Sequence, residues 1–141
     1  MLALEPETLD APGAIEADAV SGHVVFDQVS FKYPDGTDVL HDIAFEAKPG
    51  QMIAVVGLTG AGKTTLVSLI PRFYNPTSGR VLIDGVDARQ YKLRSLRERI
   101  SIVPQDAVLF SGTIADNLRY GKLDATQAEL EEAAKAAHAH D

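Results

Sequence analysis

The chain of 141 residues contains no cysteine. Disulfide bonds are therefore excluded, and a reducing cytosolic environment is permitted. A chain of this length buries about 68% of the surface that its unfolded form exposes, so it needs neither a disulfide nor a structural metal to form a core. Its length fits one globular domain or most of one.

Long apolar runs are also lacking. The longest covers residues 52–56, far short of the roughly 18 residues that indicate a membrane-spanning helix. Residues 1–22 contain five acidic residues and no Lys or Arg, which is not the pattern of a secretory signal peptide.

Positive charge is in short supply. The net charge is −7, from 13 Lys and Arg against 20 Asp and Glu. Residues 1–22 account for −5 of this charge, whereas residues 23–121 hold 11 basic and 10 acidic side chains. A nearly neutral body does not attract polyanions by bulk charge, so we expect no nucleic acid partner.

The N-terminal third predicts a linker followed by antiparallel strands. Residues 1–22 mix Pro, Ala and acidic residues without sustained periodicity, so we interpret them as an acidic linker and expect the folded part to begin near His23. Residues 24–31 alternate, with one slip between Phe26 and Val29 that indicates a β-bulge. Turn-forming residues follow, and the alternation of residues 43–47 predicts a second strand.

The following segments predict an α/β core. Residues 53–56 are continuously apolar and rich in β-branched side chains, which is typical of a strand buried on both faces of a parallel sheet. Residues 81–83 and 100–103 indicate further short strands. A helix is predicted to begin near Lys63, and Pro71 is expected to distort it or end it early. The apolar stripe of this helix consists of Leu66, Leu69, Ile70 and Phe73.

Two more helices are expected toward the C-terminus. Leu93, Leu96 and Ile100 recur at helical spacing among basic residues, which we interpret as a solvated face. Thr126 and Glu129 have the spacing of a capping box, which predicts the start of a second helix.

The strongest functional signal lies at residues 57–64, where G-L-T-G-A-G-K-T fits the P-loop pattern G-x-x-x-x-G-K-[ST]. The required context, a strand before the loop and a helix after it, is predicted. Glycines let successive backbone N–H groups approach phosphate oxygens, and the helix N-terminus adds the positive end of its dipole. The residues expected to bind the phosphates are Gly57, Thr59, Gly60, Ala61, Gly62, Lys63, Thr64 and Thr65.

Three side chains of this motif have distinct expected roles. Lys63 would reach the β- and γ-phosphates as a point charge and is the expected catalytic cation. The hydroxyl of Thr64 would be a Mg²⁺ ligand, and Thr65 would donate a further hydrogen bond to phosphate. The dinucleotide-binding pattern G-x-G-x-x-G is excluded, because the glycines have a different spacing. A GTPase would need an N-K-x-D motif, which the sequence does not contain.

Over residues 23–141 the sequence resembles the nucleotide-binding domain of ABC transporters, exporter type. The resemblance implies an α/β fold: a P-loop NTPase core, with a partial parallel sheet and helices, joined to an antiparallel β subdomain. It also implies that the linker follows a membrane domain. The segments that carry the resemblance are residues 24–36, 39–43, 49–51, 57–64, 72–76, 78–85 and 103–114.

Later motifs of that family do not occur in the sequence. These are the L-S-G-G-Q signature, the apolar strand ending in Asp-Glu (Walker B) that supplies the general base, and the switch histidine. Residues 81–84 look superficially like Walker B, but Gly85 follows where glutamate is needed, and the family has a peripheral hairpin there. We therefore expect an incomplete domain, truncated before the signature and Walker B motifs.

The resemblance assigns further site residues. Tyr33 matches the aromatic residue that stacks on adenine, and its alternative is a strand-end tyrosine packed on the hairpin. Gln105 matches the Q-loop glutamine, which reaches Mg²⁺ and the attacking water and so counts as both a catalytic and a metal-binding residue. Its alternative is an ordinary loop residue. Residues 110–117 match the stretch that contacts the membrane domain, although core packing of Leu109 and Phe110 is an equal alternative.

The resemblance also implies a function. ATP and Mg²⁺ are the expected cofactors, and the parent protein is expected to be an ATPase that couples ATP hydrolysis to export. The expected partners are a membrane domain, which contacts residues 105–117, and a second nucleotide-binding domain, identical or different. The expected location is the cytoplasmic face of the cell (inner) membrane. The 141 residues alone are expected to bind Mg·ATP without hydrolysing it; the alternative is a non-catalytic nucleotide-binding or docking module.

Overall fold

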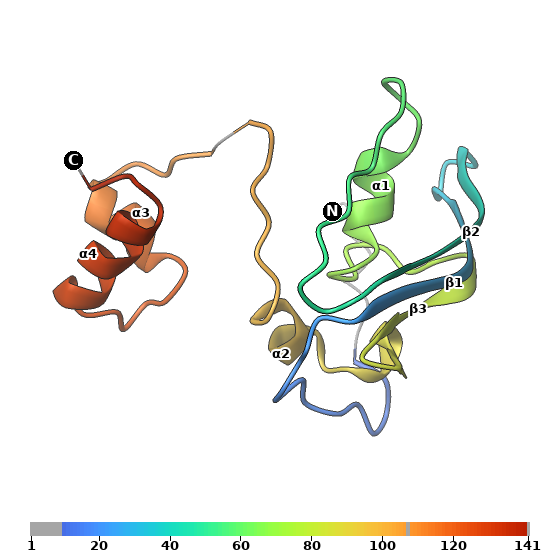
Figure 1. The fold of residues 1–141 in the computed structure, drawn as a ribbon, viewed down its shortest axis with the longest axis horizontal. Coiled ribbons are helices and arrows are strands. Elements are labelled where there is room, and N and C mark those ends of the chain that lie inside the picture. The colour runs from blue at the N-terminus through green and yellow to red at the C-terminus, as the bar shows by residue number, and fades with distance from the viewer. Residues whose placement is uncertain (1–9, 107, 141) are drawn as a thin grey trace, which may run out of the picture. The chain divides into compact units, whose positions relative to one another are not determined.

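Strand β1 (Val24–Lys32) lies at the centre of an antiparallel sheet in the computed structural model, which describes residues 10–106 and 108–140. The sheet has the order β2-β1-β3-β4, with β2 at Asp38–Ala47, β3 at Ser78–Ile83 and β4 at Val86–Asp87 (Figure 1). The expected antiparallel strands are therefore confirmed.

Five helical segments complete the described elements. They are α1 (Lys63–Ser68), the 3₁₀-helix η1 (Ala88–Gln90), α2 (Leu93–Arg97), α3 (Ile114–Arg119) and α4 (Gln127–Ala136). The chain divides after Ser101 into two units. The first holds the sheet, α1, η1 and α2; the second holds α3 and α4, and each unit is described by itself.

The predicted bulge in β1 is present and sets which side chains face the core. The register against β2 shifts between Phe26 and Val29, and Gln28 has a φ of 49°. Phe26 and Val29 are both buried, although strict alternation would place them on opposite faces. The extra residue returns Val29 to the inner face.

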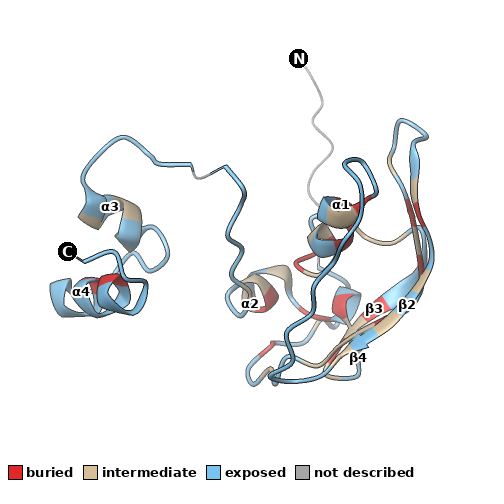
Figure 2. Ribbon diagram, turned by 45° about the horizontal axis from the view of Figure 1, so that its top comes forward, coloured by how far each residue is buried: buried red, intermediate tan, exposed pale blue. Residues whose placement is uncertain are grey.

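Helix α1 contributes Leu66 to the hydrophobic core of the sheet, and Leu69 follows just after the helix. Leu66 and Leu69 are buried in one cluster with the strand residues, while Phe26 stacks on Phe45 with ring centroids 4.6 Å apart. The helix ends at Ser68, ahead of Pro71 as expected. The residues of the buried hydrophobic cluster, which are among those coloured red in Figure 2, are Ala17, Phe26, Val29, Phe31, Leu40, Leu66, Leu69, Val81, Ile83, Ala88, Tyr91 and Leu96.

Packed structure begins earlier than the sequence indicates. Ile15 forms a parallel bridge with Tyr91, and Ala17 is 2% exposed. The Ala17 amide donates to Ser95 Oγ (3.0 Å), and Arg99 donates to the Ala17 carbonyl (3.0 Å). Arg99, which belongs to the basic helix face expected to be solvated, therefore binds the N-terminal segment instead.

Asp84 fastens the same segment to the turn between β3 and β4. Its carboxylate accepts hydrogen bonds from the Ser21 amide (2.6 Å), the Ser21 hydroxyl (2.5 Å) and the His23 amide (2.9 Å). Burial raises the pKa of Asp84, but these hydrogen bonds outweigh it and hold the pKa below its usual value. The interpretation of residues 81–84 as part of a hairpin is confirmed by the β3–β4 pairing.

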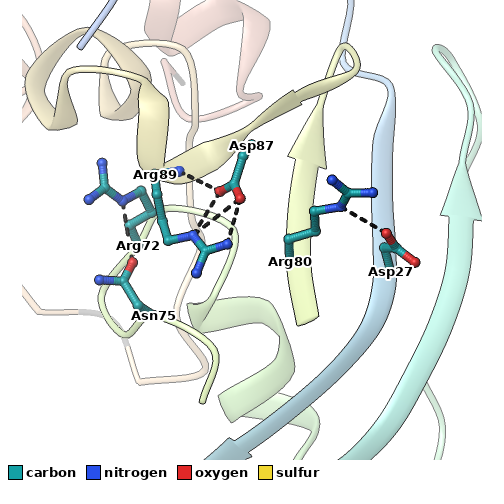
Figure 3. A network of polar contacts seen from close by, with 6 residues as sticks. All are labelled: Asp27, Arg72, Asn75, Arg80, Asp87 and Arg89. Carbon is teal, nitrogen blue, oxygen red and sulfur yellow. Dashed lines mark hydrogen bonds and ion pairs between the residues drawn. The ribbon is translucent and has the colours of Figure 1, made fainter. Parts of the chain in front are cut away.

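Polar contacts link the strands and the following turns (Figure 3). Arg80 Nε donates to Asp27 across β1 and β3 (2.8 Å), and Arg89 Nη2 donates to Asp87 (2.6 Å). The buried Arg72 guanidinium donates to Asn75 (3.4 Å). It also donates to the Tyr91 carbonyl (2.9 Å). Burial lowers the pKa of Arg72 from its ordinary value.

Two predicted parallel strands are absent from the described chain. Residues 53–56 and 100–103 have no strand pairing, and Val56 is 88% exposed and Val103 95% exposed. A strand buried on both faces needs hydrogen-bonded neighbours and covering layers. No described residues supply them to these two segments.

Each helix of the second unit begins with a capping box. Thr113 Oγ1 accepts from the Asp116 amide (3.1 Å), and Thr126 Oγ1 accepts from the Glu129 amide (3.3 Å). The predicted start of α4 at Thr126 is thus confirmed. Among the helices of residues 10–106 and 108–140, none is long and apolar enough to cross a membrane.

Replacing Glu129 with glutamine is expected to remove an acid-sensitive contribution to the stability of α4. Lys122 and the Thr126 cap lower the pKa of Glu129 from 4.5 to about 2. Because the pKa of Glu129 is lower in the folded state, its ionised carboxylate stabilises the fold fully at pH values above 4.5. This stabilisation is lost as the pH falls from 4.5 through about 2. Circular dichroism of Glu129→Gln should show less helix loss over this pH range. Glu132→Gln, the same charge change elsewhere in α4, should behave like the wild type; identical acid profiles for all three would contradict the prediction.

Candidate functional site

The P-loop residues form a tight turn that leads into α1. Gly60 and Gly62 both have a φ of 82°, in the left-handed region that favours glycine. The Ala61 amide donates to the Leu58 carbonyl (3.1 Å), and the Leu66 amide donates to the Gly62 carbonyl (2.8 Å). The loop therefore closes on itself, and the helix starts immediately after it.

Glycine is sterically required at the end of the loop. A Cβ at Gly62 would lie 2.9 Å from Val39 Cγ1 and 3.0 Å from Leu40 Cδ2. A Cβ at Gly57 would lie 3.3 Å from Ala61 Cβ and 3.9 Å from Lys63 Cδ, on the inner side of the turn. Side chains at these positions would push the loop off β2 or fill its interior.

Lys63 reaches back into the loop. Its Nζ donates to the carbonyls of Gly57 (2.8 Å) and Leu58 (2.7 Å). An ammonium group has three donors, so these two bonds orient Lys63 and leave a donor for an anion. The positive charge thus lies in the turn that the glycines shape.

The two threonines after Lys63 have different surroundings. Thr64 is exposed in the first turn of α1, which suits a hydroxyl that would ligate Mg²⁺. Thr65 is 7% exposed, and its Oγ1 lies 2.9 Å from the hydroxyl oxygen of Tyr33. The buried hydroxyl expected to meet phosphate therefore contacts the residue expected to meet adenine.

The described geometry brings most of the predicted site together. Tyr33 is half-buried at the end of β1, next to α1. Thr59 and Ala61 are exposed in the turn. Gln105 is exposed in a bend of the second unit, so its predicted contact with the P-loop stays a prediction.

The sequence patterns did not identify Tyr74 as a neighbour of Tyr33. Its ring centroid lies 5.3 Å from that of Tyr33, with an interplanar angle of 87°. The periodic pattern placed Phe73 in the buried stripe of α1, but Phe73 is 52% exposed, because the helix ends five residues earlier. The available signal was Pro71, which turns the chain so that the residue after Phe73 faces the site.

The second unit carries an apolar groove of its own. Leu109 is 81% exposed and Phe110 is 53% exposed, so core packing does not account for them. Phe110 contacts Tyr120 with centroids 4.8 Å apart, and Asn117 bonds both backbone groups of Phe110 (2.8 and 3.0 Å). The residues lining this cavity of about 420 Å³ are Val108, Leu109, Phe110, Gly112, Ile114, Asn117, Leu118 and Tyr120.

The P-loop side chains fit a nucleotide triphosphate with Mg²⁺. Gly57 adds no side chain on the inner side of the glycine turn, and Lys63 supplies the positive charge there. Thr64 would hold Mg²⁺ through its hydroxyl, and the metal would neutralise phosphate oxygens when bound.

Comparison with known proteins identifies the family of the chain. A model of the ABC transporter family matches residues 40–141. The ATP-binding/permease protein YgaD of Bacillus subtilis (strain 168), whose name assigns it to multidrug export, is 54% identical over 133 residues, covering 94% of this chain and 23% of that protein. Human ATP-binding cassette sub-family B member 6 is 48% identical over 141 residues, covering 100% of this chain and 17% of that protein.

A solved structure gives the same result for the fold. A bacterial Atm1-family ABC exporter with ATP bound matches with a TM-score of 0.90 and 42% identity, covering 99% of this chain and 24% of that chain. This chain thus spans less than a quarter of each of these three proteins. The α/β fold of an ABC ATPase inferred from sequence is confirmed. The chain belongs to the ABC transporter family, with export ATP-binding/permease proteins among its relatives.

Proposed function

We propose that the chain is the ATP-binding part of an exporter that couples ATP binding and hydrolysis to transport across a membrane. We further propose that the 141 residues bind Mg·ATP but do not hydrolyse it by themselves. The observation that carries the binding proposal is Lys63 Nζ, held 2.7 to 2.8 Å from two carbonyls of the glycine turn. A preoriented ammonium group that keeps one donor unused by these carbonyls is suited to a phosphate oxygen.

Roles for the other site residues follow from the same proposal. Tyr33 would stack on adenine, and Thr64 and Gln105 would contribute oxygen ligands to Mg²⁺. Gln105 would also orient the attacking water. Lys63 and Gln105 are then the catalytic residues that this chain contributes to the parent ATPase.

The lack of turnover is proposed from the sequence. The general base of the family follows an apolar strand that ends in Asp-Glu, and no Asp-Glu pair occurs in the 141 residues. Positioning of ATP without a base to activate water gives binding and little hydrolysis.

The proposed partners are a membrane domain and a second nucleotide-binding domain. The relative YgaD combines ATP-binding and permease parts by its name, which supports a membrane domain in the parent protein and a location at the cytoplasmic face of the membrane. The exposed groove around Leu109 and Phe110 is the proposed contact with that domain. The chain has no cysteine, so Phe110→Cys provides a unique cross-linking site in an otherwise unmodified chain. A cross-link to the membrane domain supports the contact, and labelling by solvent probes alone contradicts it.

Titration calorimetry and a phosphate-release assay on the full chain test the proposed function. Saturable binding of Mg·ATP without phosphate release above that of an identically prepared Lys63→Ala sample is the expected result. At a ligand concentration of about 100 Kd, binding should also stabilise the fold by about 2.7 kcal/mol and raise Tm by several degrees. Turnover that Lys63→Ala abolishes would refute the second part of the proposal.

A docking module is the second candidate. It is favoured by the exposed apolar groove of the second unit. In a docking module, Mg·ATP would either bind and stabilise the fold without driving any reaction, or would not bind at all. The absence of both calorimetric heat and thermal shift would refute ATP binding and leave docking as the function to test.

A further inference from the structure

We propose that residues 10–23 form a detachable acidic strap on which helix α2 depends, so that release of the strap disorders α2 while the sheet stays folded. The strap is the blue segment that precedes β1 in Figure 1. It contains three acidic residues and no Lys or Arg, whereas residues 92–99 contain four basic residues and one acidic residue. The inference concerns the first unit alone and holds whether or not the chain binds ATP.

Helix α2 has no side-chain cap of its own. Its N-cap residue is Lys92, which makes no cap hydrogen bond, and its first turn contains no acidic residue. Helices α3 and α4, by contrast, each begin with a capping box. The first backbone N–H groups of a helix have no partner within it. A helix of five residues without a cap is therefore marginal by itself.

The strap supplies the partners that α2 lacks. The Asp10 carboxylate accepts a hydrogen bond from the Leu93 amide (2.7 Å), and the Ile15 carbonyl accepts one from the Lys92 amide (2.8 Å). The Lys92 ammonium donates to Glu16 (2.5 Å). This hydrogen bond lowers the pKa of Glu16 and raises the pKa of Lys92. Residues 76 to 83 positions earlier in the sequence thus complete the start of α2.

The other end of the strap is held by the turn after β3. Asp84 accepts three hydrogen bonds, two from Ser21 and one from the His23 amide. Between the two ends, the Ala17 amide donates to Ser95 Oγ, and Arg99 donates to the Ala17 carbonyl. The strap is therefore attached to the first unit mainly through polar groups.

These attachments are weak compared with those of the sheet. Within residues 10–23 only Ala17 is buried, and its methyl group removes little apolar area from water. Exposed ion pairs each stabilise a fold only slightly. Phe26, Val29 and Leu69, which hold the sheet, are each at most 1% exposed. The strap should therefore open locally at a far lower free energy than the sheet unfolds.

Release of the strap would also affect the segment after α1. Arg97 of α2 donates to the carbonyls of Pro71 (2.9 Å) and Arg72 (3.0 Å). These carbonyls follow the helix that begins at Lys63. The contacts of α2 therefore link the N-terminal segment of the chain to the end of the helix that follows the P-loop.

Amide hydrogen exchange, followed by NMR on the full chain, tests the dependence of α2 on the strap. Asp84→Asn removes the charge that Ser21 and His23 contact, and asparagine suits the left-handed backbone at this position (φ 51°). In this variant the amides of residues 15–23 should exchange about tenfold faster or more, and those of α2 about three- to tenfold faster. The amides of β1 and β2 should keep their wild-type rates.

Two further variants make the result specific. Asp42→Asn makes the same charge change at a similar φ of 47°, in β2 at the opposite edge of the sheet from β4. It should leave the exchange of the strap and of α2 within about twofold of the wild type. Ala17→Lys puts a long cationic side chain beside Arg99 at a position that is 2% exposed, so it should release the strap without changing Asp84.

Four outcomes would overturn the inference. Unprotected strap amides in the wild type would show that the strap is not bound. Faster exchange of the strap with unchanged exchange of α2 would show that the helix does not depend on it. Equal acceleration of strap, α2 and β1 in Asp84→Asn would show that the strap does not detach separately from the sheet. Wild-type rates in both Asp84→Asn and Ala17→Lys would show that these contacts do not hold it.

Discussion

Replacing Lys63 with alanine is expected to weaken Mg·ATP binding by about a hundredfold or more. Lys63 Nζ is held between the carbonyls of Gly57 and Leu58, where its charge is available to the phosphates. Hydrogen bonds to charged groups contribute about 1.5–3 kcal/mol each. One such hydrogen bond from Lys63 to a phosphate oxygen, at the upper end of this range, is enough for about a hundredfold change, because each factor of ten corresponds to about 1.4 kcal/mol.

The fold should tolerate this substitution. The carbonyls that accept from Lys63 belong to exposed residues, so water replaces the ammonium when it is removed. The thermal midpoint without nucleotide should therefore change little, while the increase caused by Mg·ATP disappears. Calorimetry and thermal unfolding together separate loss of the site from loss of the fold.

Two controls sharpen the result. Lys48→Ala makes the same charge change at an exposed position of the first unit and should leave the affinity within about twofold. Lys63→Arg keeps the charge but replaces a compact ammonium by a planar fork, so most of the affinity should still be lost. An affinity of Lys63→Ala within about threefold of the wild type would contradict the assigned role.

Local patterns of the sequence predicted the parts of the fold that neighbouring residues determine. The slip in alternation between Phe26 and Val29 predicted the bulge that the register shift confirms. The Thr126 capping box predicted the start of α4, because its partners are three residues apart. The P-loop pattern predicted the glycine turn, since the loop is one continuous segment.

Contacts between distant segments could not be predicted in this way. The bond between Tyr33 and Thr65 depends on how β1 and α1 approach each other, and nothing in either segment alone encodes it. For residues 53–56 the sequence predicted a strand that the described structure does not contain. Their composition predicts a doubly buried strand, but a strand forms only where neighbours complete its hydrogen bonds, and the described residues do not pair with it. Ala17 was missed because one small apolar residue in an acidic segment gives no periodic signal.

The second large effect is expected for Gly79→Ala, which should destabilise the fold by about 3 kcal/mol or more. The β1 bulge explains why. Ser30 pairs with Ser78 and Asp27 with Arg80, so two residues of β1 oppose Gly79 alone. A Cβ at Gly79 would lie 2.2 Å from the Gln28 carbonyl oxygen and 2.5 Å from that of Asp27, and these backbone atoms cannot move without separating β1 from β3.

Gly85 provides a control that isolates the clash from backbone strain. Gly79 and Gly85 have φ values of 73° and 81°, but a Cβ at Gly85 would meet nothing within 4 Å. Gly85→Ala should therefore cost only about 1–2 kcal/mol, the left-handed penalty of an L-residue. Urea unfolding of the two variants and the wild type measures the difference. If both alanines cost the same, the close approach of β3 to the bulge is not what requires glycine at position 79, and the left-handed backbone alone explains it.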